Sequence, residues 1–346
     1  MENEITKQIE SIISEPVTDE KHILQQLKKV IRDAETQSSI ERNSKSISDL
    51  CAETIQLIEN HPSGDLFKTG FENYDNQFGG LSAGEFVVIG GRPAMGKTQM
   101  LVTMALHLSL NQPVLYYTYD LSETYLSYRF ISGITAIPGT NLVQHKLADD
   151  EKSRLSTVES EMEKRQLFIM DGGKLNLYAF IEHCSKQIVE KGVKVVIIDY
   201  LQLMTASNNY RSRDSEISEI VREFKNIATN NNVCVIASSQ LNRTVESRGG
   251  TRRPILSDLR DSGAIEQDAD KVLFIYRPEY YGLDVFEDGN STDCVIELIL
   301  AKNRIGNTGS IHLLRDKSFT RIFSDEKYLK KLSFSDKRLE EFDMPF

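Results

Sequence analysis

The chain has 346 residues, with 41 lysines and arginines against 51 aspartates and glutamates, which gives a net charge of −10. Its shares of hydrophobic residues (40%) and charged residues (27%) exclude a disordered or fibrous protein. No apolar run approaches the ~20 residues of a membrane span, and the acidic, polar start does not have the form of a signal peptide. The four cysteines lie far apart and make no CxxC pair, which argues against disulfides or zinc and favours a cytoplasmic location.

Residues 1–64 differ in pattern from the rest of the chain. Apolar residues at helical spacing predict one helix around Leu24–Ile31 and a second helix over 47–59, which the breaker residues 60–64 end. Two short amphipathic helices cannot bury both apolar stripes alone, so we expect them to dock on a larger body or on another copy. We predict three parts: this helical N-terminal segment at 1–64, one large domain at 65–325 and a charged C-terminal tail at 326–346.

From Leu66 onward, short apolar segments alternate with helical ones. The predicted strands are 86–89, 114–119, 167–170, 193–198, 233–238, 272–276, 294–300 and 311–314. The clearest helix is predicted over 214–230, where one face carries Ile217, Ile220, Val221, Phe224, Ile227 and Ala228. Strands that are apolar throughout predict an α/β fold, with a mostly parallel sheet covered on both faces. The last strands follow one another without helices, so we expect an antiparallel edge.

The strongest motif is GRPAMGKT at residues 91–98, which matches GxxxxGK[ST], follows the apolar segment FVVIG and opens a helix. In such a loop, glycines let backbone N–H groups approach phosphate oxygens, the ammonium of Lys97 neutralises phosphate charge, and the hydroxyl of Thr98 can bind Mg²⁺. We therefore predict a nucleoside triphosphate site. Its residues, with the one that follows the motif, are Gly91, Arg92, Pro93, Ala94, Met95, Gly96, Lys97, Thr98 and Gln99.

Two strand-end carboxylates are candidates for the chemistry. Asp199 ends the apolar run VKVVIID, and an aspartate there can hold Mg²⁺ through its water shell. Tyr200 follows it where many ATPases have a catalytic glutamate, so the base has to come from another strand. We expect VLYYTYDLSE to lie beside the P-loop strand, and it offers Asp120 and Glu123. We favour Asp120 as the base, because Ser122 has the form of an N-cap that carries Glu123 into the next helix. A solvated strand-end aspartate is the alternative for Asp120.

Gln240, at the end of the segment VCVIASSQ, is a candidate sensor of the γ-phosphate, with a satisfied strand-end amide as the alternative. The chain from Arg243 to Arg260 then carries five arginines against Glu246 and Asp258, a local charge of +3, with two glycines that make it a flexible loop. A second loop, NNYRSRD, is also basic. Basic loops of this kind can contact the phosphates of a nucleic acid strand. Solvated surface loops are the alternative.

Together, these segments resemble the motor domain of the DnaB-type replicative DNA helicases. The matching stretches TGFENYDNQFGGLSAGEFVVIGGRPAMGKT, IIDYLQLM, SSQLNR, SDLRDSGAIEQDAD and AKNRIGNTG occur in the family's order across residues 69–309. The resemblance implies a RecA-like P-loop NTPase core, a hexameric ring, ATP and Mg²⁺ as cofactors, and translocation on single-stranded DNA, usually 5′ to 3′, with unwinding of duplex DNA during replication. A primase or a helicase loader would be a further partner.

The resemblance also assigns roles by motif position. Lys97 and Thr98 would hold phosphates and Mg²⁺, Asp199 would support the metal, and Gln240 would couple ATP to DNA. The positions of three more residues imply ATP-site roles: Arg129 as a nucleotide contact, and Lys302 and Arg304 as basic residues that reach the neighbour's ATP site. Arg260, Asp261 and Gly263 take the positions of phosphate contacts on DNA, and Arg243 and Arg252 belong to the same arginine-rich loop.

Two features depart from the family pattern. The family has glutamate, within Ser-Leu-Glu-Met, where this chain has Asp120 within Thr-Tyr-Asp-Leu. Aspartate is one methylene shorter, so its oxygen would fall ~1 Å short of the attacking water, a displacement that can cost ~10²-fold in rate. We also expect most of the N-terminal collar domain to be absent, so that 1–64 is a helical remnant with the linker helix. Primase docking and ring stability depend on that collar in the family.

Two other interpretations stay open. A different RecA-like ATPase, a recombinase or a regulatory hexamer, would bind duplex DNA or protein without unwinding and would not need the SGAIEQDAD segment. A non-catalytic assembly factor would bind helicase subunits through the linker helix and hold ATP as a structural ligand. The missing collar and the aspartate at position 120 favour the latter. ATP hydrolysis with and without single-stranded DNA, alongside fork unwinding, separates the three.

Overall fold

The computed structural model describes residues 45–60, 66–206, 210, 212–287 and 289–324, together with residues 6–7, 11–12 and 30. Contacts divide the chain into two units, Met1–Gly64 and Asp65–Phe346. In the first unit, the helix predicted over 47–59 is confirmed as α3 (Ile47–Asn60), whose apolar residues Leu50, Leu57 and Ile58 are exposed. The helix predicted around Leu24–Ile31 lies, apart from Val30, outside the described residues, as does the tail at 326–346.

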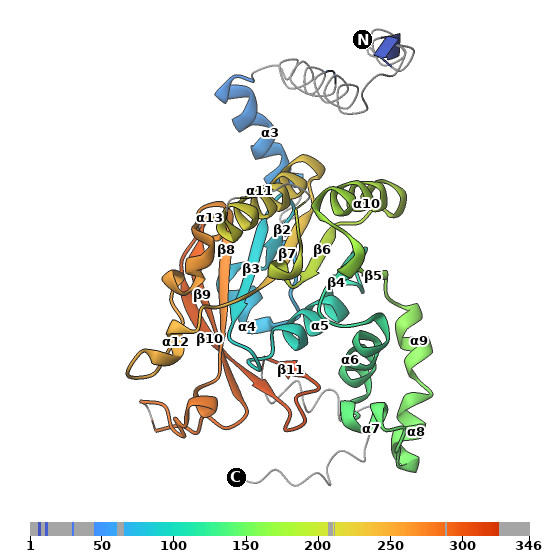
Figure 1. Ribbon diagram of the computed structural model, residues 1–346, viewed down its shortest axis with the longest axis vertical. Helices are drawn as coiled ribbons and strands as arrows, with labels where there is room; N and C mark the ends of the chain where they lie inside the picture. Colours follow the sequence, from blue (N-terminus) through green and yellow to red (C-terminus); the bar gives the residue numbers. More distant parts are fainter. Residues whose placement is uncertain are drawn as a thin grey trace. The chain divides into compact units, whose positions relative to one another are not determined.

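The described residues of the second unit form a nine-stranded sheet in the order β11-β10-β9-β8-β3-β7-β6-β4-β5 (Figure 1). Its strands are β3 (Phe86–Gly91), β4 (Val114–Thr118), β5 (Leu167–Asp171), β6 (Val195–Asp199), β7 (Cys234–Gln240), β8 (Lys271–Tyr276), β9 (Val295–Asn303), β10 (Gly309–Arg315) and β11 (Ile322–Phe323). The pairs from β8 to β5 are parallel, and those among β8, β9, β10 and β11 are antiparallel. All eight predicted strands and the antiparallel edge are thereby confirmed. A small antiparallel pair, β1 (Leu66–Phe67) with β2 (Leu81–Ser82), stands apart from the sheet.

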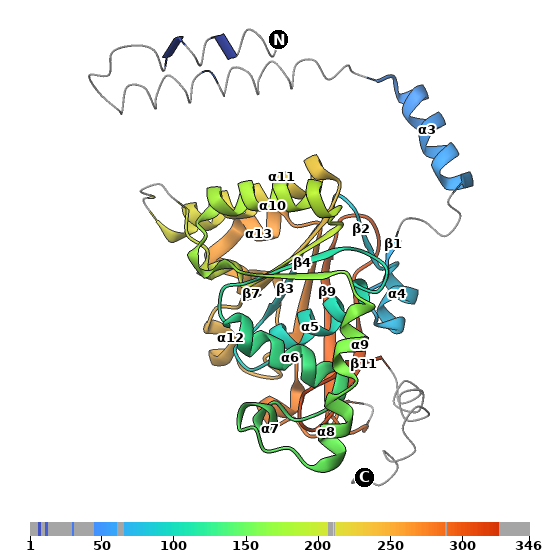
Figure 2. The same ribbon diagram turned by 90° about the vertical axis from the view of Figure 1, so that its right-hand side faces the viewer.

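Helices cover both faces of the sheet, as predicted (Figure 2). On one face α4 (Glu72–Phe78), α5 (Lys97–Leu108) and α6 (Glu123–Thr135) contribute to one apolar core, and on the other face α10 (Leu177–Lys191), α11 (Arg213–Asn231) and α13 (Gly263–Asp268) contribute to a second. The remaining elements are α7 (Gly139–Val143), α8 (Asp149–Leu155), α9 (Val158–Glu163), α12 (Thr244–Ser247) and the short 3₁₀ helices η1 (Gly172–Lys174), η2 (Leu201–Leu203), η3 (Leu256–Ser262) and η4 (Pro278–Tyr281). No helix of the described part is both long and apolar enough to cross a membrane.

The buried strands explain the apolar runs of the sequence. In β3, Val87 and Ile89 belong to the core under α5, whereas Phe86 and Val88 belong to the core under α11. Successive side chains of a strand point to opposite faces, so a strand covered on both faces needs apolar residues at every position. On α11, the six apolar residues predicted as one face are all buried.

The predicted position of β4 beside the P-loop strand is wrong. β3 pairs with β7 and β8. Two strands, β7 and β6, separate β3 from β4, which lies between β6 and β5. Helix α5, which follows β3, packs against β3, β7, β6 and β4, so it carries the chain across two strand positions before β4 begins. This crossing still brings the end of β4 to the same edge of the sheet as the P-loop.

Candidate active site

The residues of the P-loop motif form the turn between β3 and α5. Ala94 and Gly96 have φ angles of 63° and 101°, in the left-handed region that favours glycine. Gly96 is the N-cap of α5, and a Cβ added there would collide with the ring of Phe319. The first N–H groups of α5 have no partner within the helix, so this turn presents them, with the positive end of the helix dipole, to an anion.

Lys97, the first residue of α5, lies largely buried beside the loop. Its Nζ donates to the carbonyl oxygens of Gly91 at 2.9 Å and Arg92 at 3.2 Å. Burial lowers the pKa of Lys97 to about 8, against the opposing effect of the nearby carboxylates Asp199 and Asp120. A buried ammonium with a lowered pKa gains from an anionic partner, which a phosphate at the loop would be.

Asp199 ends β6 and is 2% exposed. One carboxylate oxygen accepts a hydrogen bond from Ser238 Oγ at 2.5 Å and the other from the Tyr116 hydroxyl at 3.2 Å. Burial raises the pKa of Asp199, while hydrogen bonds from Ser238, Thr98 and Tyr116 and the charge of Lys97 lower it. The structure therefore brings together Lys97, Thr98 and Asp199, as the motifs predict.

Sequence reasoning missed Ser238 and Tyr116 as partners of Asp199. The parallel register pairs Ile198 with Ala237, so the next residues, Asp199 and Ser238, lie side by side. A prediction of the strand order would have identified Ser238, because it ends the neighbouring strand one residue after that pair. The residues Tyr116 and Tyr117 are buried on opposite faces of β4, and the face of Tyr116 is the one under α5.

The side chains of Thr98 and Asp199 fit the donor set of a magnesium ion in a nucleotide site. Mg²⁺ in nucleotide sites is usually held by one or two protein oxygens, by phosphates and by waters. A hydroxyl and a buried carboxylate are such a donor set, and a cation would compensate the burial that raises the pKa of Asp199. Within the described part of the chain, no three His, Cys, Asp or Glu side chains gather into a metal cluster of their own.

The two candidate bases after β4 have different surroundings. Asp120 is exposed, and its charge acts on both Lys97 and Tyr200, so it lies at the edge of the sheet that carries the P-loop. Glu123 is the first residue of α6, and Ser122 caps this helix by accepting a hydrogen bond from Tyr125 N, as predicted. The Glu123 carboxylate instead accepts a hydrogen bond from the backbone N–H of Asp171, at the end of β5, at 3.2 Å.

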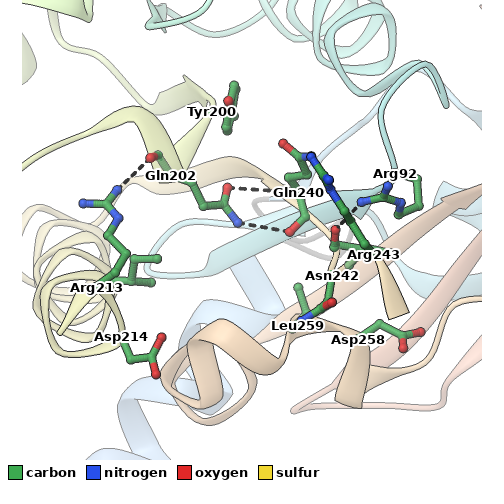
Figure 3. A pocket seen from close by; sticks show the side chains of 12 residues that line it. Arg92, Tyr200, Gln202, Arg213, Asp214, Gln240, Asn242, Arg243, Asp258 and Leu259 are labelled. Atoms are coloured by element: carbon green, nitrogen blue, oxygen red, sulfur yellow. Dashed lines mark hydrogen bonds between the residues drawn. The ribbon is translucent and has the colours of Figure 1, made fainter. Parts of the chain in front are cut away.

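Gln240, the last residue of β7, borders a cavity of about 530 Å³ (Figure 3). Gln202 bridges to it: Gln202 Oε1 accepts from Gln240 N at 3.1 Å, and Gln202 Nε2 donates to Gln240 O at 3.1 Å and to Ser239 Oγ at 2.8 Å. The cavity is lined by Arg92, Tyr200, Gln202, Arg213, Asp214, Ile217, Gln240, Leu241, Asn242, Arg243, Asp258 and Leu259. Residues from the P-loop, from the end of β6 and from the arginine-rich loop thus share one cavity.

Three arginines of the arginine-rich loop have partners within their own chain. Arg248 pairs with Asp258, and Arg253 pairs with Glu297 on β9. The guanidinium of Arg252 lies over the ring of Tyr281, with the two groups centred 5.5 Å apart. Glu297 and Tyr281 lie outside the loop, so its composition alone could not reveal these two contacts.

Two of the five predicted DNA contacts are only partly described. Arg243 is exposed and lines the cavity. Arg260 and Asp261 belong to η3, but their side chains lie outside the described part of the structure. Gly263 is exposed and begins α13. In the second basic loop, Arg213 donates to the carbonyl oxygens of Gln202 and Met204 and pairs with Glu216, so it holds its own loop together.

The other residues that the sequence predicts to bind the nucleotide differ in their surroundings. Pro93 is exposed and Met95 is buried in the core. The side chain of Arg92 turns to Leu241 and Glu246, and Gln99 Nε2 donates to the carbonyl oxygen of Thr320 at 2.6 Å. Arg129 is exposed on α6, and no described contact joins it to the P-loop.

Lys302 and Arg304 lie at the end of β9, far from the P-loop of their own chain. The register pairs Asn303 with Lys271 on β8, and Lys271 with Val87 near the start of β3. In this chain, both side chains dock at the end of α13. Lys302 Nζ donates to the carbonyl oxygens of Glu266 at 2.6 Å and Gln267 at 3.0 Å, and Arg304 pairs with Asp270 at 3.2 Å.

The P-loop between β3 and α5, Asp199 on β6 and the parallel sheet define a P-loop NTPase of the RecA-like class. Residues 67–324 match the family model of the DnaB-like helicase C terminal domain. The chain belongs to this family. The resemblance stated from its motifs is thereby confirmed.

Known proteins of the family are similar over most of the chain. A probable replicative DNA helicase of Trieres chinensis is 39% identical over 259 residues, which cover 74% of this chain and 56% of that protein. The chain thus spans about half the length of the curated relatives it matches. A solved ATPase domain has a TM-score of 0.74 at 29% identity, over 82% of this chain and all of that one. A DnaB-like replicative helicase, solved in a study of its interactions with primase, has a TM-score of 0.71 at 28% identity, over 92% of this chain and 75% of that one.

Proposed function

We propose that this chain is the motor of an ATP-dependent DNA helicase of the DnaB type, which moves along single-stranded DNA from 5′ to 3′ and unwinds duplex DNA during replication. The observation that carries the proposal is the meeting of Lys97, Asp199 and Gln240 at one edge of the parallel sheet. The arginine-rich loop begins directly after Gln240. ATP chemistry and a candidate DNA-binding segment therefore share the end of one strand.

In the proposed reaction, the N–H groups of the P-loop and the ammonium of Lys97 bind the phosphates of ATP. Thr98 and Asp199 hold Mg²⁺, which balances the phosphate charge when bound. Asp120, exposed at the same edge, accepts a proton from the attacking water. Gln240 responds to the γ-phosphate, and Arg129 contacts the nucleotide. Membership of a helicase family supports hydrolysis rather than mere binding.

For DNA binding, we propose Arg243, Arg252 and Arg260, together with Asp261 and Gly263, on the loop that leaves β7. The exposure of Arg243 at the cavity supports this role. Contacts to phosphates by basic side chains give binding that is independent of sequence and weakens with salt. The internal pairs of this loop then fix its shape rather than bind DNA.

The position of Lys302 and Arg304 supports an assembly of several copies, which we propose to be a hexameric ring. At the opposite edge of the sheet, these side chains can complete an ATP site only in another copy. Charge supplied in this way by an arginine finger is worth ~10³–10⁵ in rate in other NTPases. The exposed apolar residues of α3 are candidates for packing on the neighbour. We propose 65–325 as the motor, 1–64 as the linker part and 326–346 as a tail.

We further propose a primase or a helicase loader as a partner, because a solved relative is described with its interactions with primase. Since the substrate proposed is chromosomal or plasmid DNA, the cytoplasm is the proposed location. The test is unwinding of a forked duplex by the purified protein with ATP and Mg²⁺. We expect unwinding of a fork with a free 5′ tail and ATP hydrolysis that single-stranded DNA stimulates. Hydrolysis without any response to DNA would contradict the proposal and favour a different RecA-like ATPase.

A further inference from the structure

Arg92 belongs to the P-loop by sequence, but its side chain binds a different segment of the chain. Its Nη1 donates to the carbonyl oxygen of Leu241 at 2.8 Å, and its Nε and Nη2 donate to Glu246 Oε1 at 2.9 and 2.8 Å. Figure 3 shows Arg92 at the rim of the cavity shared with Gln240. Arg92 is 5% exposed, whereas the side chain of Glu246 is 48% exposed, so the guanidinium is shielded from water while the carboxylate that accepts its charge-assisted bonds is not.

The partners of Arg92 begin the segment 241–262, which carries most of the proposed DNA contacts. Leu241 also donates its backbone N–H to the carbonyl oxygen of Gly91, at 3.4 Å. Glu246 lies on α12, two residues before Arg248. Arg248 pairs with the buried Asp258 of η3, whose other carboxylate oxygen accepts from the N–H of Ile255 at 2.8 Å. These hydrogen bonds and ion pairs, together with the short stretch of chain from Glu246 to Arg248, therefore connect the P-loop to η3.

At the P-loop, this connection begins beside the nucleotide site. Lys97 Nζ donates to the carbonyl oxygens of Gly91 and Arg92. A phosphate in the P-loop attracts the ammonium of Lys97, and so competes with these two carbonyl oxygens for its N–H groups. Nucleotide binding thus acts on the backbone of the residue whose side chain holds the segment 241–262.

We propose that Arg92 is a positioning residue which, through Glu246 and Leu241, makes the conformation of the segment 241–262 depend on the nucleotide in the P-loop. Arg92 contributes its backbone to the phosphate loop and its guanidinium to this link. The consequence for DNA binding rests on the proposed function, but the link itself does not.

Hydrogen exchange of the backbone amides of 242–255 tests the link without DNA. The full chain is compared with and without a non-hydrolysable ATP analogue and Mg²⁺, in the wild type and in Glu246→Ala. We expect the analogue to change the exchange rates at least about fivefold in the wild type, the lower end of measured coupling between sites. In Glu246→Ala the change should fall below about twofold, while the analogue still binds, with its affinity changed by no more than the coupling that is lost. Glu161→Ala is the matched control, because Glu161 also pairs with basic side chains on a short helix.

Two results would overturn the link: no effect of the analogue on 242–255 in the wild type, or an equal effect in Glu246→Ala. If Glu246→Ala does not fold, Glu246→Leu decides the question, because it fills the space of the side chain and offers Arg92 no acceptor. A full wild-type response in Glu246→Leu would then overturn the proposal, and a reduced response supports it.

Stimulation of ATP hydrolysis by oligo(dT), measured on the same proteins, separates this inference from the proposed function. Absence of stimulation in the wild type contradicts the helicase function and leaves the exchange result standing. Where oligo(dT) stimulates hydrolysis by the wild type, we expect the stimulation of Glu246→Ala to be at least about fivefold smaller. Its rate without DNA should be unchanged. Full stimulation in Glu246→Ala would overturn the role of the link in coupling.

Discussion

Lys97 and Arg304 lie near opposite ends of the strands in the central sheet. Lys97 follows the carboxyl end of β3, whereas Arg304 follows Asn303, which the register places beside the amino end of β3 through Lys271. The six residues of β3 separate the two edges by roughly 15–20 Å. Arg304 also pairs with Asp270 of its own chain. A catalytic role of Arg304 at a P-loop therefore requires a second copy of the chain.

The lowered pKa of Lys97 predicts that ATP binding takes up protons in mildly alkaline solution. In the free protein this pKa is about 8, and phosphate charge at the loop raises it on binding. Above about pH 8, Lys97 is partly neutral before binding and charged afterwards, so affinity falls as the pH rises. Calorimetry at about pH 9 in buffers of different ionisation enthalpy measures this uptake. Lys97→Ala should abolish it along with hydrolysis, and equal uptake in that variant would exclude Lys97 as its source.

Asp120→Asn should eliminate turnover and retain ATP binding, because an amide cannot accept a proton from the attacking water. Glu123→Gln is the matched control. The Glu123 carboxylate accepts from the backbone of Asp171 on β5, so its replacement should leave the rate within about threefold. Single-turnover hydrolysis and nucleotide binding measure the two effects. The choice of base is wrong if Asp120→Asn hydrolyses ATP and Glu123→Gln does not.

Tyr116→Phe and Ser238→Ala should each raise the Mg²⁺ concentration that hydrolysis needs, by ~10-fold or more. Both hydroxyls orient the carboxylate of Asp199, and partners of a metal-binding carboxylate are typically worth 10–100-fold in metal affinity. Titration of activity with Mg²⁺ measures this shift. Tyr117→Phe is the control, because its hydroxyl instead bonds His183 on the other face of the sheet. An unchanged Mg²⁺ requirement in both variants would contradict the role of Asp199 in binding Mg²⁺.

Arg243→Ala should weaken binding of single-stranded DNA about equally for all sequences. Removal of one phosphate contact flattens the dependence of log K on log salt by about one unit. Fluorescence anisotropy with a labelled oligonucleotide at several salt concentrations measures the slope. Arg222→Ala, an exposed arginine on α11 that does not line the cavity, should leave the slope unchanged. The same slope for Arg243→Ala and the wild type would remove Arg243 from the DNA path.

The sequence predicted those parts of the fold and site that depend on neighbouring residues. The strand-turn-helix of the P-loop, the buried face of α11 and the N-cap Ser122 follow from local spacing and composition. The strand order did not follow, because the length of α5 and its path over β7 and β6 decide where β4 pairs. A local pattern contains no information on that path.

The missed contacts of the site have the same cause. Arg92 and Glu246 are 154 residues apart, and Arg253 and Glu297 are 44 residues apart, so only the folded chain brings them together. The motif predicts from its position that Arg92 binds the nucleotide, whereas its side chain binds Leu241 and Glu246. Charge counting likewise could not reveal that Arg253 pairs with Glu297 and that Glu246 pairs with Arg92, because both partners lie outside the loop.

The most direct test of a motor whose ATP sites are shared between copies is hydrolysis by a mixture of two inactive variants, Lys97→Ala and Arg304→Ala. In an equal mixture, about a quarter of the interfaces join an intact P-loop from one copy to an intact Arg304 from the next, if copies assemble head to tail at random. We predict that each variant alone hydrolyses almost no ATP and that the mixture recovers a substantial part of the activity. A mixture that stays as inactive as its components, while both variants still form the same oligomer as the wild type, would contradict the shared site.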